Sequence, residues 1–266
     1  MNGKGAVVAR RRRRRASFGD WVVALVVLAV MAVAFVPQAR ARAGAAWESA
    51  SSRFGIEIPH LSSELPWGRP SDPVASLPES EAATLLKTLP VRDSRSADAP
   101  SYDRSAFGQA WADEDRNGCD TRNDVLARDL ARPTFKPGTK DCVVLTGTLA
   151  EPYTGATVEF RRGQDTSALV QIDHVVALGD AWRSGAWQWD ASTRQRFAND
   201  PSNLLAVDGR TNEDKSASAA DEWLPPNAAF RCEYATRQIR VKSTWGLSVT
   251  APERAALAEA LATCPS

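Results

Sequence analysis

The pattern of apolar and polar positions predicts an α+β domain. Two β-rich stretches, 142–149 and 157–160, flank the turn residues 151–155 and predict a β-hairpin. A long apolar run at 171–178 and a short one at 203–207 predict two further strands. Apolar residues at helical spacing predict helices over about 78–91, 123–130, 211–223, 227–243 and 252–262. Residues 179–200 are expected to form a helical or irregular excursion packed on the core. Their tryptophans, Trp182, Trp187 and Trp189, are expected to be core residues, and so is Trp223.

The N-terminus has the three parts of an export signal. Six arginines, Arg10 to Arg15, precede an apolar run at 21–36, and small residues at alternate positions follow at 39–43. The run is shorter than the roughly 20 residues that span a bilayer. Residues 1–43 are therefore a signal peptide or a membrane anchor, and either one exports the rest of the chain, with membrane contact only if the segment is uncleaved. Residues 44–80, rich in Ser, Pro and Ala, are predicted as a linker, and 81–266 as the folded domain.

The net charge of +1 conceals an acidic body. Residues 1–43 hold nine basic side chains and one acidic one, so the remainder has 24 basic and 31 acidic side chains and a net charge of −7. This excludes a protein that binds nucleic acid mainly through a strongly basic surface. It leaves room for a hydrolase with a local basic groove, for which Arg161, Arg162, Arg183, Arg194, Arg196, Arg210 and Lys215 are candidates.

Four cysteines, Cys119, Cys142, Cys232 and Cys264, all lie in the exported body. In an oxidising compartment an even number favours two disulfides. Three pairings are open, and the simplest joins sequence neighbours, Cys119 to Cys142 and Cys232 to Cys264. The absence of a Cys-x-x-Cys motif argues against a zinc ribbon.

Asp173 and His174 interrupt the most apolar strand of the chain. Burying an unpaired carboxylate costs several kcal/mol, so this pair is either a satisfied structural pair or a catalytic and metal site. Asn203, Asn212 and Lys215 follow it in an order that implies strand, long loop, strand and helix. That combination favours catalysis over a structural role.

Three motifs carry a resemblance to known nucleases: Ile172-Asp173-His174-Val175-Val176, Asn203-Leu204-Leu205 and Asn212-Glu213-Asp214-Lys215-Ser216. Together they resemble the ββα-metal (HNH) endonuclease superfamily in its His-Asn-Asn form. They are most similar to the family named after the C-terminal domain of GmrSD-type restriction enzymes. The resemblance implies a ββα-metal core at about 171–226 with flanking helices, and a metal-dependent endonuclease acting on DNA, with RNA as an alternative substrate.

The resemblance also implies roles for single residues. His174 would be the general base, Asp173 and Asn212 the metal ligands, and Asn203 the residue that braces the loop and orients the histidine. Lys215 would reach a phosphate from the helix. A neutral imidazole can deprotonate water near pH 7. An all-oxygen ligand set favours one Mg²⁺ or Mn²⁺ over Zn²⁺.

A second motif supports a rival interpretation. Asp113, Asp115, Asn117 and Asp124 match the opening and the twelfth position of a calcium-binding loop, with Asp in place of the usual Glu. On this interpretation the chain is a non-catalytic, disulfide-stabilised extracellular module that binds Ca²⁺ or a partner. Another metal-dependent hydrolase of the cell envelope is a further alternative.

Overall fold

The structure is a computed structural model that describes residues 73–93 and 99–265. The chain divides into two compact units at residues 66 and 67, and every described residue belongs to the second unit. The predicted signal or anchor and most of the predicted linker lie outside the described residues. The helices and strands, in chain order, are α3 (Glu81–Thr88), β1 (Val91–Arg92), α4 (Thr121–Asp129), β2 (Leu130–Phe135), β3 (Val144–Ala150), β4 (Thr157–Arg161), β5 (Val170–His174), α5 (Leu178–Arg183), α6 (Ala191–Ala198), β6 (Leu204–Asp208), α7 (Gly209–Lys215), α8 (Arg231–Thr244), β7 (Val249–Thr250) and α9 (Ala251–Leu261).

Mixed helices and strands confirm the predicted α+β class. At the centre, β5 pairs antiparallel with β6, with Ile172 opposite Ala206 and His174 opposite Leu204. Asp208 caps the following helix α7 by accepting a hydrogen bond from the Thr211 amide at 2.8 Å. The predicted order of strand, loop, strand and helix is therefore present. The prediction of a helix over 211–223 was wrong in length, because α7 ends at Lys215 and Ser216 has a left-handed φ of 52°.

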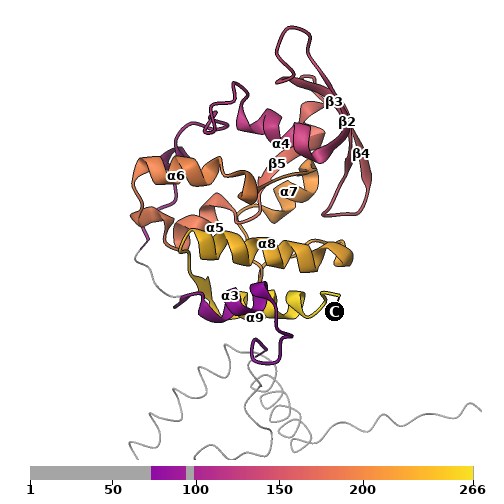
Figure 1. Cartoon of the computed structure of the whole chain (residues 1–266). Coiled ribbons are helices and arrows are strands. Elements are labelled where there is room, and N and C mark those ends of the chain that lie inside the picture. The colour runs from indigo at the N-terminus through magenta and orange to yellow at the C-terminus, as the bar shows by residue number, and fades with distance from the viewer. Residues whose placement is uncertain (1–72, 94–98, 266) are drawn as a thin grey trace, which may run out of the picture. The chain divides into compact units, whose positions relative to one another are not determined.

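A three-stranded sheet, β2–β3–β4, lies beside this core (Figure 1). Its β3–β4 pair is the predicted hairpin. The third strand, β2, follows α4 directly and was not predicted. Gly147 in β3 faces β2, where a Cβ atom would come within 2.8 Å of the Leu130 Cβ, so only glycine fits this close approach.

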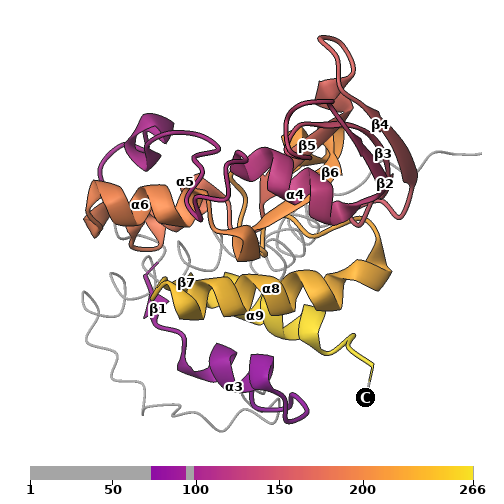
Figure 2. The same cartoon turned by 45° about the horizontal axis from the view of Figure 1, so that its top comes forward.

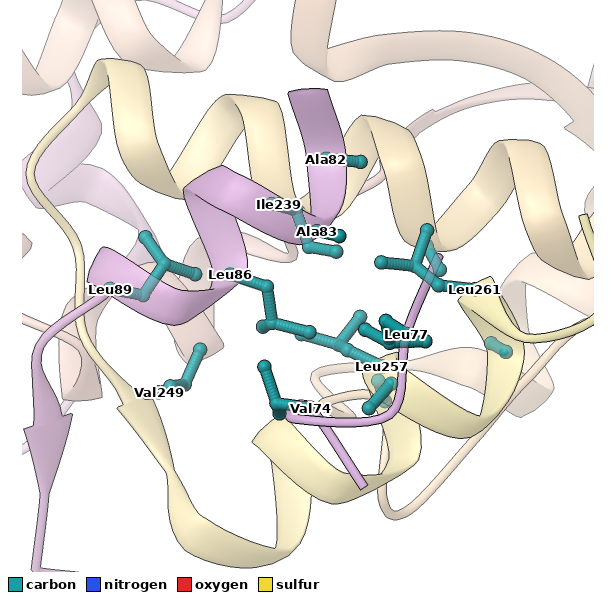
Figure 3. Close-up of a cluster of buried hydrophobic side chains, with 14 residues drawn as sticks. Val74, Leu77, Ala82, Ala83, Leu86, Leu89, Ile239, Val249, Leu257 and Leu261 are labelled. Carbon is teal, nitrogen blue, oxygen red and sulfur yellow. The ribbon is translucent and has the colours of Figure 1, made fainter. Parts of the chain in front are cut away.

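Helices α3, α8 and α9 form a layer below the ββα core (Figure 1, Figure 2). Figure 3 shows the apolar cluster between them, in which Leu86 of α3 faces Ile239 of α8 and Leu257 of α9. Both C-terminal helices were predicted. The described chain begins within the segment that we expected to be linker, and its Val74 and Leu77 are buried in this cluster.

Two disulfides and a buried ionic cluster stabilise the domain. The two disulfides join Cys119 to Cys142 and Cys232 to Cys264, as the nearest-neighbour pairing predicted. Lys242 of α8 is fully buried and pairs with Asp180 of α5 at 2.7 Å and with Glu253 of α9 at 2.5 Å. One ammonium thus ties three helices together.

The four tryptophans singled out in the sequence pack in or against the apolar clusters, as predicted. Trp182 is buried, and Trp187 and Trp189 pack against the same apolar cluster. Trp223 packs beside Tyr153 and Tyr234. None of the helices in 73–93 and 99–265 has the length and apolar character needed to cross a bilayer.

Candidate active site

His174 lies at the end of β5, almost fully buried, with its Nε2 2.8 Å from the carbonyl oxygen of Ala198. A carbonyl only accepts hydrogen bonds, so Nε2 carries the proton. Burial lowers the pKa of His174 to about 4, outweighing the opposing effect of the Ala198 carbonyl, and the positive charges of Arg104 and Lys215 lower it further. The neutral imidazole therefore keeps an unprotonated Nδ1. This is the state that a general base needs.

Asp173 is held by two neighbours that come from distant parts of the chain. The Tyr153 hydroxyl donates to its Oδ2 at 2.5 Å, and the Lys215 ammonium donates to its Oδ1 at 3.0 Å. Burial raises the pKa of Asp173, while Lys215 and both hydrogen bonds act in the opposite direction. Each carboxylate oxygen retains a second lone pair.

Lys215 is completely buried, and its ammonium also donates to the His174 carbonyl oxygen at 2.9 Å. A contact between Lys215 and a phosphate, as expected from the sequence, would require the ammonium to leave both of these acceptors. In the structure it neutralises Asp173 and fastens α7 to the end of β5.

Asn203 is fully buried immediately before β6 and binds the chain just beyond His174. Its side-chain oxygen accepts from the Val176 amide at 2.8 Å, and its side-chain nitrogen donates to the Val176 carbonyl at 3.1 Å. Its own carbonyl accepts from the Val175 amide at 2.8 Å. These three bonds fix the backbone that carries His174, which is the geometry of a bracing residue.

Asn212 of α7 turns its side-chain nitrogen toward Gln171, to whose Oε1 it donates at 2.8 Å. This hydrogen bond uses the side-chain nitrogen of Asn212, so the side-chain oxygen lies at the other end of the same amide group. Asn212 lines a cavity of about 400 Å³ together with Asp173, His174 and Glu213. The strand and the helix thus bring the predicted base and both predicted metal ligands to one cavity.

The side-chain atoms that line this cavity determine which kind of metal ion could bind there. Within residues 73–93 and 99–265, no group of three or more His, Cys, Asp and Glu side chains is placed to hold a metal. The carboxylate of Asp173 and the amide oxygen of Asn212 are hard donors, and Mg²⁺ binds through one or two such groups while keeping water or phosphate oxygens. Asp173 and Asn212 thus bring oxygen donors to the wall of one cavity.

Sequence reasoning missed four contributors to this site: Arg104, Trp111, Tyr153 and the Ala198 carbonyl. The Trp111 ring stacks on the His174 imidazole, with centroids 6.2 Å apart and planes at 19°. A second cavity, of about 250 Å³, opens beside His174 and is lined by Arg104, Phe107 and Trp111. Only the turn position of Tyr153 was evident beforehand; the contacts themselves leave no mark in the local sequence.

Several arginines expected to form a basic groove have other partners. Arg162 donates to the Val144 carbonyl at 2.6 Å, Arg183 to the Ala217 carbonyl at 2.7 Å and Arg194 to the Ala106 carbonyl at 2.8 Å. Arg104, which was not among the candidates, lines both cavities.

The calcium-loop residues also meet in space. The Asn117 side-chain nitrogen donates to Asp115 at 3.0 Å and to Asp124 at 3.1 Å, and the Asn117 amide donates to Asp113 at 3.0 Å. Burial raises the pKa of Asp124, and Asp113 and Asp115 add to that rise. Calcium binding at this loop stays a prediction.

Comparison with known proteins places the chain in a family. Residues 120–260 match the model of the GmrSD restriction endonucleases, C-terminal domain. An uncharacterized secreted protein from Arthroderma benhamiae is 39% identical over 187 residues, which cover 70% of this chain and 85% of that protein. No solved structure matches the chain. The match spans both strands and the helix of the ββα core, and the chain belongs to the family of the C-terminal domain of GmrSD restriction endonucleases.

Proposed function

We propose that this protein is an exported, metal-dependent endonuclease that hydrolyses phosphodiester bonds of DNA, with RNA as an alternative substrate. The observation that carries the proposal is the state of His174: neutral, fixed through Nε2 and next to two oxygen donors in one cavity. The family name connects the chain with nucleases. Export is supported by the two disulfides, by the N-terminal sequence and by a relative that is called secreted.

The residues act in a simple sequence. Nδ1 of His174 takes a proton from water, the water oxygen attacks phosphorus, and the bond between phosphorus and the 3′ oxygen breaks. Asp173 and Asn212 would hold a Mg²⁺ or Mn²⁺ ion, which when bound supplies positive charge to the phosphate and to the departing oxygen. Asn203 and Lys215 are positioning residues, because both act on the backbone or carboxylate beside His174 rather than on solvent.

The test is cleavage of supercoiled plasmid DNA by the purified protein with Mg²⁺ or Mn²⁺ and with EDTA. His174→Ala should lower the rate at least a hundredfold, the usual contribution of a general base. His60→Ala, which removes the other histidine of the chain, should leave the rate unchanged. Wild-type protein that cleaves neither DNA nor RNA with any divalent ion would instead favour the non-catalytic binding module.

A further inference from the structure

The second cavity beside His174 differs in character from the first. The larger cavity is lined by Asp173, Asn212 and Glu213, whereas the smaller one is lined by Phe107, Trp111 and Ala198 and has no acidic side chain in its wall. His174, Arg104 and Leu178 belong to both walls. A group that enters the smaller cavity therefore lies next to His174 yet meets mainly aromatic and aliphatic surface.

The wall formed by residues 104–111 is held in place. Arg194 of α6 donates to the Ala106 carbonyl at 2.8 Å, and Gln195 of α6 accepts from the Gln109 amide at 3.3 Å. Trp111 has a left-handed φ of 60°. Residues other than glycine rarely adopt this backbone conformation, and when they do it is often at functional sites. This backbone presents the indole parallel to the His174 ring.

From these features we infer that the smaller cavity binds one unstacked nucleobase next to the scissile phosphate, so that the enzyme acts on single-stranded or locally unpaired nucleic acid. The inference rests on the proposed function. At about 250 Å³ the cavity is somewhat smaller than the roughly 300–1,000 Å³ of pockets that enclose whole small ligands, which suits one flat ring system. Bases stack on aromatic side chains regardless of sequence, and Arg104 can contact the phosphate that follows. A paired base inside a duplex cannot reach such a cavity without leaving its stack.

The first experiment compares one labelled oligonucleotide as a single strand and as a duplex, each cleaved by the full chain with Mn²⁺. We expect the single strand to be cleaved at least tenfold faster. A single abasic position next to the cleaved bond should lower kcat/KM of the single strand about tenfold, within the range of base–aromatic stacking. Equal cleavage of single strand and duplex would overturn the inference while leaving the proposed function standing.

The second experiment pairs protein variants with these substrates. Trp111→Ala should lower kcat/KM on the intact strand about tenfold but cause little further loss on the abasic strand, because the contact is already absent. Trp111→Phe, which keeps an aromatic face, should restore most of the rate. If the losses from Trp111→Ala and from the abasic site multiply, Trp111 has only a structural role and the base site is elsewhere.

A binding measurement separates this inference from the proposed function. Ala110 is exposed and lines the smaller cavity, so Ala110→Trp should fill it and weaken binding of a fluorescein-labelled single-stranded decamer in EDTA at least fivefold. Val91→Trp, at an exposed strand position that lines neither cavity, is the matched control. Decamer binding that depends on Ala110 in a protein without cleavage activity would support the cavity and contradict the nuclease. Unchanged binding by Ala110→Trp would contradict the cavity.

Discussion

The imidazole of His174, the general base of the proposed reaction, is buried and therefore hard to protonate. Burial lowers its pKa to about 4, from 6.5 for an exposed histidine. The neutral form thus persists over a wider pH range than that of an exposed histidine. Because the folded-state pKa is depressed, the same group contributes stability above about pH 6.5 and loses that contribution as the pH falls toward 4.

This shift predicts the acid side of the pH–rate profile. At saturating Mn²⁺, kcat/KM should stay nearly constant from pH 7 to pH 5 and fall only near pH 4. An ordinary histidine base would lose about thirtyfold between its neutral plateau and pH 5. The measurement is a profile of kcat/KM from pH 4 to 8, with metal titrated at each pH to keep the site saturated. A break near pH 6.5 would show that the base is more exposed than the structure indicates.

At the scale of elements, the ββα unit depends on a buried ion pair between β5 and α7. Lys215→Met removes the partner of a buried carboxylate and should destabilise the domain by about 3–5 kcal/mol, read from urea unfolding. Lys87→Met, at an exposed position of α3, should change stability by less than about 0.5 kcal/mol.

A double variant distinguishes loss of charge balance from loss of packing. Asp173→Asn combined with Lys215→Met removes both charges and should recover much of the stability that Lys215→Met loses. If the double variant is as unstable as the sum of its two parts, the contribution of Lys215 lies in its packing rather than in its charge.

How far the sequence predicts this fold is also seen element by element. The hairpin and helices α8 and α9 followed from apolar periodicity, whereas the two central strands followed from apolar runs, because both of their faces are buried. Strand β2 did not, since Arg132 and Pro133 break its alternation. The end of α7 depends on the left-handed backbone at Ser216, which composition does not specify. At the site, the motif order placed Asp173, His174, Asn203 and Asn212, whereas Tyr153 and Trp111 arrive through tertiary packing alone.

At the scale of the whole molecule, the cluster around Lys242 links stability to pH. Burial raises the pKa of Glu253 to about 7, against the opposing charge of Lys242, and Asp180 raises it further. The folded protein therefore keeps a proton that the unfolded chain releases near pH 4.5. The contribution of the protonated Glu253 side chain to stability is complete below about pH 4.5 and is lost as the pH rises through 7.

The predicted outcome is a difference between variants. From pH 5 to pH 8 the wild-type protein should lose on the order of 2 kcal/mol more stability than Glu253→Gln, whose amide does not titrate. Glu259→Gln, at an exposed position of the same helix, should follow the wild type. Guanidinium unfolding at the two pH values gives both differences. Parallel behaviour of all three proteins would mean that Glu253 stays ionised in the folded state.

The pairing of β1 with β7 governs when this domain can finish folding. Val91 lies opposite Val249, and Arg92 lies opposite Thr250. Strand β1 therefore cannot pair until β7, the last described strand, has been synthesised. During synthesis or translocation, α3 has no partner until α8 and α9 emerge, and loop closure over such a separation slows folding. A chain interrupted before residue 249 would thus expose the apolar face of α3 to proteases and aggregation. Folding of the domain is thereby coupled to synthesis of the segment that contains α8, β7 and α9.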